Sequence, residues 1–523
     1  MAVASRAITL RSHLAGRWVE GGDPQTLVNP ATEEPLAQAG SAGLDLAAAL
    51  DFARRTGGPA LRALTFAERG QLLRAMADTL QAHRDELLDL AVRNGGNTRS
   101  DAKFDVDGAT FTLAAYADIG KGLGAVRFLV DGEGIPLARS PRFHGQHLMV
   151  PRQGVAVHVN AFNFPAWGLA EKAAVALLAG MPVLSKPGTS SAMVAHRIVE
   201  ILAEKQVLPA GALSLLVGGA GDLLEHLGPQ DVVAFTGSSD TGARVRGLPQ
   251  VIRNSVRVNV EADSLNAAVL GPDADPASET YDFFLKDVLR DITQKAGQKC
   301  TAIRRVMVPA HVADRVRDDL AERLRAVTVG NPAHEGVRMG PVATAGQLED
   351  VRKGIDLLAR DGRLVYGDAD AKPVGAPPGK GFFVGPVLLE VEAGADAPSV
   401  HSHEVFGPVA TIVPYEGPAE VVELVTRGRG GLVSSVYSED AAFTTEVVMG
   451  LAPFHGRIFL GSAKIAEMSP GPGTVLPHLV HGGPGRAGGG EELGGLRGLA
   501  FYSQRVALEG SRPTIERMIN PGR

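Results

Sequence analysis

The only cysteine of the 523-residue chain lies in a short polar loop, Gly297-Gln298-Lys299-Cys300-Thr301. A predicted helix precedes this loop, and an apolar stretch at 306–308 follows it. A cysteine thiolate is a strong nucleophile, and a loop can present it to a substrate. Because free cysteines are usually buried as small hydrophobic residues, the loop alone does not decide between catalysis and packing.

Two polar residues follow predicted strands, where open α/β sheets place their ligands. Asn163 lies in the loop after the apolar strand at 154–159, and its amide can donate a hydrogen bond to an oxyanion. Glu261 ends the strand sequence SVRVNVE and can act as a general base. Considered singly, each residue has an ordinary alternative, a turn-forming asparagine or a strand-end carboxylate.

Two other segments have features of a cofactor site. In Phe235-Thr236-Gly237-Ser238 a strand runs into a helix, and small residues at a helix N-terminus leave room for a phosphate or a cofactor ring. The segment is not a G-x-G-x-x-G motif, so its signal is weak by itself. Glu404 and Phe406 lie in the sequence HEVFGP, where the carboxylate can accept hydrogen bonds from ribose hydroxyls.

The elements that must position these residues alternate between strands and helices. Apolar strands are predicted at 154–159, 182–186, 212–217, 231–236 and 255–260, with helices between them, and a second alternating block begins after residue 266. This rhythm predicts parallel sheets covered on both faces, and the chain length predicts two large domains. The glycine-rich stretch 481–498 is typical of a linker, yet a strand at 499–508 is expected to follow it.

Composition excludes several classes of protein. The chain is 45% hydrophobic and 21% charged with a net charge of −6, which indicates neither nucleic acid nor another polyanion as a partner. One cysteine excludes an intramolecular disulfide and fits a reducing compartment. The N-terminus lacks a signal-peptide core, and the longest apolar run, 173–184, is too short to cross a membrane. We therefore expect a cytoplasmic protein, and no metal site.

Taken in order, these motifs resemble those of the aldehyde dehydrogenase superfamily. The family pattern has an Asn before Phe-Pro, a Lys-Pro strand end, F-T-G-S, a Glu, a G-Q-x-C loop and an E-x-F-G-P loop. In this chain the pattern reads Asn163, Lys186-Pro187, Phe235–Ser238, Glu261, Gly297–Cys300 and Glu404–Pro408. The resemblance runs from about Trp18 to the C-terminal strand, and six ordered motifs make it specific.

The resemblance implies the α/β aldehyde dehydrogenase fold. We expect a Rossmann-like cofactor-binding domain at 1–126 and 151–264 and an α/β catalytic domain at 265–480. A small β oligomerisation arm is expected at 127–150 and 481–523. In the family such an arm bridges subunits, so the resemblance also implies a homodimer.

The resemblance further implies a mechanism. Cys300 attacks the aldehyde and forms a thiohemiacetal, whose oxyanion is held by the Asn163 amide and the Cys300 backbone N–H. Loss of hydride to the nicotinamide cofactor gives a thioester. Glu261 then activates the water that releases the carboxylic acid.

Departures from the family pattern indicate one particular branch of the superfamily. The usual E-L-G-G-K reads Glu261-Ala262-Asp263-Ser264-Leu265 here, and the interval from Glu261 to Cys300 is a few residues longer than usual. Together with GQKCTAIRR and the glycine-rich stretch, these departures resemble the branch of the superfamily whose members oxidise coenzyme A-linked semialdehydes in aerobic aromatic (benzoate) breakdown. No hydratase domain follows, which favours 3,4-dehydroadipyl-CoA semialdehyde over 3-oxo-5,6-dehydrosuberyl-CoA semialdehyde. Glu261 argues against a CoA-acylating enzyme, because that chemistry needs no hydrolytic base.

The cofactor preference is predicted from the segment Lys186-Pro187-Gly188-Thr189. Many NAD-preferring relatives have an acidic residue where Thr189 stands. Its absence removes a charge that would repel a 2′-phosphate, and Lys186 can pair with that phosphate. We expect NADP, with NAD possible, and Phe235–Ser238, Glu404 and Phe406 to complete the cofactor site.

Overall fold

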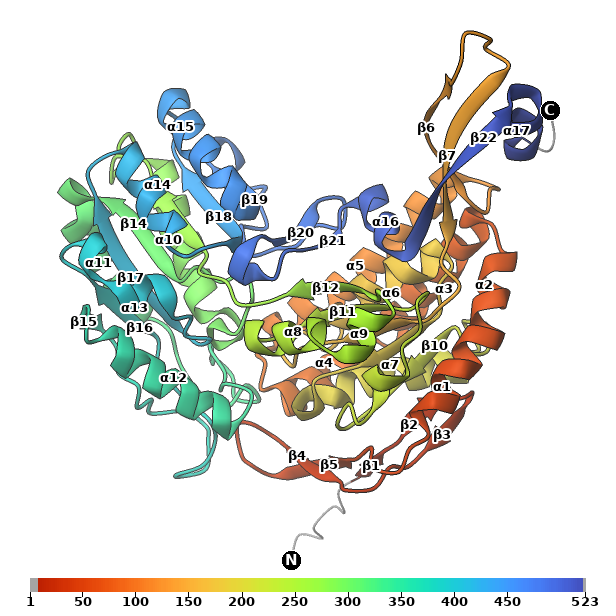
Figure 1. Cartoon of the computed structure of the whole chain (residues 1–523). Coiled ribbons are helices and arrows are strands. Elements are labelled where there is room, and N and C mark those ends of the chain that lie inside the picture. The colour runs from red at the N-terminus through yellow and green to blue at the C-terminus, as the bar shows by residue number, and fades with distance from the viewer. Residues whose placement is uncertain (1–7, 521–523) are drawn as a thin grey trace, which may run out of the picture.

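The computed structural model describes residues 8–520 and contains two seven-stranded sheets (Figure 1). Five parallel strands of the first sheet come from the predicted alternating region, and two antiparallel strands from the N-terminal segment extend it. In sheet order the strands are β12 (Arg257–Glu261), β11 (Val232–Thr236), β8 (Ala156–Val159), β9 (Val183–Lys186), β10 (Leu213–Leu215), β2 (Ser12–Leu14) and β3 (Arg17–Val19).

Long helices cover this sheet. The helix α6 (Trp167–Ala179) is apolar almost throughout and nearly all of its residues are buried, because it packs between the sheet and the helix α5 (Arg99–Leu123). The helical run predicted at 66–94 is two helices, α3 (Phe66–Ala82) and α4 (Arg84–Gly95), which are separated at His83. The other helices of this half are α1 (Leu46–Phe52), α2 (Gly58–Ala63), α7 (Ala192–Glu204), α8 (Ser239–Arg246) and α9 (Pro249–Arg253).

The second sheet contains the later strands, and all of them are parallel except β15. In sheet order they are β15 (Arg363–Tyr366), β16 (Val387–Glu390), β17 (Val409–Tyr415), β14 (Arg305–Pro309), β13 (Ala267–Leu270), β18 (Gly431–Tyr437) and β19 (His455–Gly461). Its helices are α10 (Glu279–Thr293), α11 (Ala313–Arg325), α12 (Ala345–Leu358), α13 (Pro398–Ser402), α14 (Pro418–Thr426) and α15 (Ala441–Leu451).

An arm projects from the body at the upper right of Figure 1. It is a three-stranded antiparallel sheet in the order β22 (Ser503–Ser511), β7 (Phe143–Pro151), β6 (Leu129–Pro136), with the helix α17 (Arg512–Ile519) beside it. The strand predicted at 499–508 begins later, because residues 499–502 form the short helix α16 (Leu499–Tyr502). A small sheet of β1 (Ile8–Leu10), β5 (Pro35–Ala39) and β4 (Gln25–Val28) lies near the N-terminus.

Part of the predicted arm segment belongs to the body of the molecule. The strands β20 (Val480–Gly483) and β21 (Gly490–Leu493) form a hairpin that contacts β18 and β19 on one side and β12 and α6 on the other. Of the predicted arm segment 481–523, only the part from residue 503 onwards forms the arm. The ends of two predicted domains, 1–7 and 521–523, lie outside the described residues.

The glycines of this hairpin are needed for close packing. A Cβ at Gly483 would overlap the carbonyl oxygen of Gly431 in β18, and a Cβ at Gly490 would press on Asn259 in β12. The stretch that resembles a linker in sequence is thus packed against both sheets. Within residues 8–520, no helix is long and apolar enough to cross a membrane.

Candidate active site

The three predicted catalytic residues lie together in one cavity. Asn163 lies in the loop between β8 and α6, Glu261 ends β12, and Cys300 lies in the loop between α10 and β14. The other lining residues come from these two loops, α5, α6, β11, the 473–475 segment and the hairpin. They are Phe104, Asn160, Ala161, Phe164, Trp167, Gly168, Glu171, Lys172, Thr236, Thr301, Gly473, Val475 and His481.

The loop that carries Cys300 begins with an unusual backbone conformation. Lys295, Ala296 and Gly297 have φ values of 53°, 51° and 68°, so three successive residues lie in the left-handed region. Only glycine adopts this region without steric cost. A Cβ at Gly297 would also overlap the carbonyl oxygen of Gly407, so this position requires glycine.

Side-chain amides fix the same loop from two sides. Asn266 Nδ2 donates to the carbonyl oxygens of Cys300 at 2.8 Å and Ala302 at 2.9 Å. Asn163 Nδ2 donates to the carbonyl of Gln298 at 3.2 Å. The amide that we predicted to stabilise an oxyanion therefore also ties the β8–α6 loop to the nucleophile loop.

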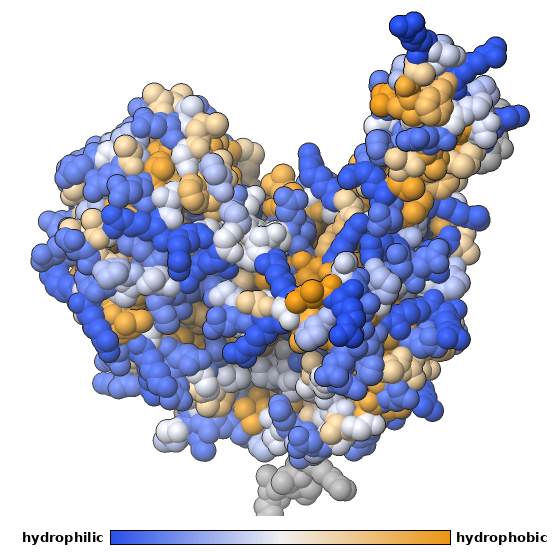
Figure 2. All heavy atoms as spheres, viewed as in Figure 1, coloured by the Kyte–Doolittle hydropathy of each residue, from blue (hydrophilic) through white to orange (hydrophobic). Residues whose placement is uncertain are grey.

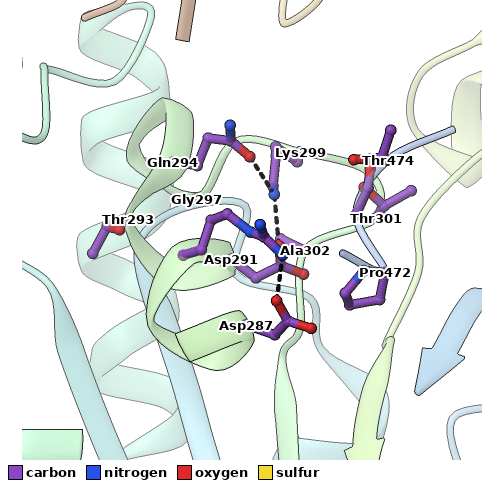
Figure 3. Close-up of polar contacts among 12 residues, drawn as sticks. Asp287, Asp291, Thr293, Gln294, Gly297, Lys299, Thr301, Ala302, Pro472 and Thr474 are labelled. Carbon is purple, nitrogen blue, oxygen red and sulfur yellow. Dashed lines mark hydrogen bonds and ion pairs between the residues drawn. The ribbon is translucent and has the colours of Figure 1, made fainter. Parts of the chain in front are cut away.

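A buried lysine next to the cysteine completes the support of the loop. Figure 3 shows Lys299 between Gln294 and Asp291; its Nζ lies 2.7 Å from Asp291 Oδ1 and 2.9 Å from Gln294 Oε1. On the other side of the cysteine, Thr301 Oγ1 donates to the carbonyl of Gly473 at 2.8 Å. Lys299 thus holds the loop in place through Asp291 and Gln294.

Cys300 is part-buried, and its Sγ lies 3.9 Å from Nε2 of His481. Burial raises the pKa of the Cys300 thiol well above its ordinary value, and the Glu261 carboxylate raises this pKa further. The resting residue is therefore a thiol, and the reaction requires a group that removes its proton.

Glu261 is the nearest carboxylate, and each of its oxygens has a partner. Oε1 lies 3.0 Å from Nε2 of His481, and Oε2 accepts from Thr236 Oγ1 at 3.2 Å. Burial raises the pKa of Glu261, but the charge and the hydrogen bond of His481 outweigh burial and hold the net pKa below its usual range. The carboxylate is thus ionised at neutral pH.

Three more charged residues lie behind Glu261. Nζ of Lys172, from α6, lies 3.0 Å from Glu171 Oε1 and 3.0 Å from Glu492 Oε2. Glu492 Oε1 accepts from Asn259 Nδ2 at 3.0 Å, and burial raises the pKa of Glu492 to about 7. The adjacent Glu171 and Lys172, in a helix that is apolar elsewhere, are a sequence signal for buried charge, whereas Glu492 gives none.

His481 is the functional candidate that the sequence analysis missed. It lies on β20, directly across the hairpin from Glu492, and its side chain is buried against Cys300 and Glu261. The glycines around it indicated a linker, so the segment was assigned to the arm. No feature of the local sequence signals that this histidine reaches a cysteine 181 residues away.

The predicted cofactor residues form two groups. Lys186 and Thr189 lie at the carboxyl end of β9 and just beyond it, where Lys186 Nζ donates to the Pro187 carbonyl at 3.1 Å and Thr189 Oγ1 to the Gly218 carbonyl at 3.0 Å. Phe235 and Thr236 end β11, Gly237 follows, and Ser238 caps α8. Of these, Thr236 lines the cavity with Cys300.

The second group, Glu404 and Phe406, lies just before β17 of the second seven-stranded sheet. Glu404 is partly buried, with Oε2 accepting from the Ser264 backbone N–H at 3.0 Å and Oε1 from Arg304 Nε at 3.3 Å. Phe406 lies under the Arg304 guanidinium, 5.3 Å from the ring centroid, and meets Phe162 edge-on. Both carboxylate oxygens of Glu404 thus have protein donors, and a ribose would add to them.

Comparisons with known proteins found a family and several similar proteins. The model of the aldehyde dehydrogenase family matches residues 18–506. The 3,4-dehydroadipyl-CoA semialdehyde dehydrogenase of Aromatoleum evansii is 49% identical over 477 residues, which cover 91% of this chain and 93% of that protein. The non-phosphorylating aspartate-semialdehyde dehydrogenase of Halomonas elongata is 29% identical and covers 91% and 92%.

Solved structures agree on the fold. An aldehyde dehydrogenase from Bacillus cereus, solved as an NAD+ complex, superimposes with a TM-score of 0.84 at 23% identity, covering 96% of this chain and 97% of that one. A point mutant of the betaine aldehyde dehydrogenase of Staphylococcus aureus, solved in its apo form, gives a TM-score of 0.83 at 22% identity and covers 96% of each chain.

Proposed function

The chain belongs to the aldehyde dehydrogenase family, and from this premise we propose that it oxidises a coenzyme A-linked semialdehyde to the carboxylic acid with NADP as oxidant. The substrate that we propose is 3,4-dehydroadipyl-CoA semialdehyde, in aerobic benzoate degradation. The observation that carries the proposal is the convergence of Cys300, Glu261 and Asn163 in one cavity.

The first half of the reaction uses Cys300 as nucleophile. Glu261 accepts the thiol proton, the thiolate attacks the aldehyde carbon, and a thiohemiacetal forms. The free N–H of the Asn163 amide and the Cys300 backbone N–H stabilise the negative oxygen. When bound, the nicotinamide cofactor supplies the hydride acceptor that turns the thiohemiacetal into a thioester.

The second half uses Glu261 as general base. After the proton taken from Cys300 has passed to solvent, Glu261 removes a proton from water, and the resulting hydroxide attacks the thioester carbon. The carbon–sulfur bond then breaks with its electron pair on sulfur, which takes the proton back from Glu261. Glu261 thereby separates this enzyme from a CoA-acylating one, in which coenzyme A itself accepts the acyl group. Support for hydrolysis comes from the ionised state of the Glu261 carboxylate.

The proposed substrate agrees with the cavity wall and with the relatives. Phe104, Phe164, Trp167 and Val475 form an apolar wall beside Cys300, which suits an unbranched acyl chain. The Aromatoleum evansii relative, at 49% identity over most of both chains, carries the name of an enzyme for 3,4-dehydroadipyl-CoA semialdehyde. The coenzyme A part would remain outside the cavity.

The proposed NADP preference depends on the end of β9. Lys186 forms no ion pair with any carboxylate among residues 8–520, so its ammonium remains available for a 2′-phosphate. Thr189 brings no negative charge there. The N-terminus of α8, capped by Ser238, offers backbone N–H groups to a cofactor phosphate.

The test is a substrate panel with both cofactors. We expect kcat/KM to be highest for CoA-linked semialdehydes with NADP, and turnover to continue without free coenzyme A. A requirement for free coenzyme A would establish acyl transfer. Faster oxidation of 3-oxo-5,6-dehydrosuberyl-CoA semialdehyde would reassign the substrate, and equal or higher efficiency with NAD would refute the cofactor preference.

The Cys300→Ala variant separates catalysis from binding. We expect the loss of the nucleophile to abolish oxidation, while nucleotide titration of the variant gives a dissociation constant close to that of the parent enzyme. Residual turnover above the uncatalysed rate would contradict the role of Cys300.

A further inference from the structure

We propose that His481 is a further catalytic residue, whose Nε2–H is one hydrogen-bond donor shared between the Glu261 carboxylate and the Cys300 thiolate. The inference rests on the proposed nucleophilic role of Cys300. It adds a residue that neither the motifs of the chain nor its predicted mechanism include.

The geometry places one nitrogen beside two potential anions. Nε2 of His481 lies 3.0 Å from Glu261 Oε1 and 3.9 Å from Cys300 Sγ, and the second separation is within hydrogen-bond reach for sulfur. The ring therefore does not pass a proton from one nitrogen to the other. Instead, a single N–H faces both groups.

The surroundings of the ring fix the position of its proton. Nδ1 of His481 is buried and has no hydrogen-bond partner among the described residues. A proton on Nδ1 alone would bury an unpaired donor and would leave the lone pair of Nε2 facing the Glu261 carboxylate. A ring protonated only on Nδ1 is therefore disfavoured for two reasons, and Nε2 carries a proton in both the neutral and the charged ring.

The donor can then follow the negative charge. Before the reaction, Glu261 is ionised and receives the Nε2–H hydrogen bond. When Cys300 gives its proton to Glu261, the S–H bond breaks, an O–H bond forms, and the negative charge moves to sulfur. Nε2–H then donates to the thiolate, and no atom or electron leaves the group. The same donor stabilises the thiolate that departs when the thioester is hydrolysed.

Charged groups from several elements face His481. Burial lowers the pKa of His481, but Glu261 outweighs burial and Glu171 adds to its effect, so the net pKa is raised; Arg457 of β19 acts against them. Lys172 and Glu492 lie behind Glu261 on α6 and β21. These groups keep the site polar without bringing another donor to the sulfur within the described residues.

The test measures alkylation of Cys300 by iodoacetamide across a range of pH, without aldehyde or nucleotide. Because the pKa of Cys300 is raised, the rate rises with pH as the thiolate forms. In His481→Phe the thiolate loses its donor, so we expect the midpoint to move up by about one pH unit, which is about a tenfold lower rate at neutral pH. His481→Gln keeps an N–H donor and should recover most of the rate.

Two variants, His455→Phe and His481→Gln, separate the loss of a shared hydrogen-bond donor from a disturbance of packing. His455→Phe removes a buried histidine of β19 that does not line the cavity, and it should leave the alkylation profile unchanged. If His481→Phe keeps the parent profile, or if His481→Gln is as slow as His481→Phe, the proposal is overturned.

A measurement on the parent enzyme does not depend on any variant folding. In protein with ¹⁵N-labelled histidine rings, the ring nitrogens of His481 should report a proton on Nε2, and a ring that is protonated only on Nδ1 would overturn the proposal. Alkylation uses neither substrate nor cofactor. A failed substrate panel with the expected alkylation profile would therefore refute the proposed substrate and not the role of His481.

Discussion

Each oxygen of the Glu261 carboxylate is bound by a different part of the chain, one by His481 and the other by Thr236. A glutamine in its place would keep the shape and most of the contacts, but it could not accept a proton. Substitution of Glu261 therefore tests acid–base chemistry with little disturbance of packing.

We predict that Glu261→Gln slows steady-state turnover by about 10²–10⁴-fold, the usual contribution of a general base. Because Glu261 accepts a proton in both halves of the reaction, the first turnover should be slowed as well, and stopped-flow absorbance should show no burst of reduced cofactor. Glu491→Gln is the matched control, since Glu491 is exposed on the same hairpin. A variant that turns over at the parent rate would exclude Glu261 as the base.

The sequence allowed Asn163, Glu261 and Cys300 to be selected as candidates, because Glu261 ends a strand, Asn163 lies in the loop after a strand, and Cys300 is the only cysteine of the chain. The neighbours that adjust their proton affinity could not be predicted in the same way. His481 and Glu492 reach the cavity only because the hairpin folds back between the two sheets. Lys172 stood out, with Glu171, as a charge in an apolar helix, but its other partner, Glu492, lies on the hairpin.

At the scale of elements, the nucleophile loop depends on its backbone as much as on its side chains. Three left-handed residues turn the chain sharply after α10, and Asn266 and Lys299 then hold the loop in place. Gly297 packs directly against Gly407, so the position of Cys300 depends on the absence of a side chain there.

We predict that Gly297→Ala lowers kcat/KM by at least tenfold, because displacing the loop by about 1 Å misplaces the sulfur. It should also lower the thermal unfolding midpoint, since a Cβ at this position is both strained and obstructed. Gly122→Ala provides the matched control, because Gly122 lies in α5 with open space around it. That substitution should leave activity unchanged and stabilise the helix by about 0.5–1 kcal/mol.

Most predicted strands and helices are present within a few residues of their expected positions, because alternating apolar strands and amphipathic helices leave clear patterns. The helix break at His83 and the helix at 499–502 were missed because local patterns continue through them. The role of the glycine-rich hairpin could not be predicted, since small residues that permit flexibility also permit close packing.

The arm is the feature that concerns the whole molecule. Within residues 8–520, each of its edge strands, β6 and β22, pairs only with the central strand β7. Their outer edges are therefore unpaired, and such edges can pair with another subunit. Figure 2 shows apolar side chains along the arm, and several are exposed. They include Val130, Ile135, Leu137, Phe143, Val506 and Met518. We infer that this surface is covered in a homodimer.

We predict that Val506→Asp shifts the enzyme from dimer to monomer in analytical ultracentrifugation, because a charge would be buried in the interface. Leu364→Asp is the control, since Leu364 is similarly exposed on β15, outside the arm. That variant should keep the parent mass. A parent enzyme that sediments as a monomer would refute the dimer itself.

The hairpin of β20 and β21 touches both large sheets and carries His481, which lines the cavity, and Glu492, which pairs with Lys172 behind Glu261. The contact between the two sheets and the charges around Glu261 therefore depend on the same hairpin. We expect that a substitution far from the sulfur that loosens this contact would first be detected as a changed pH–rate profile.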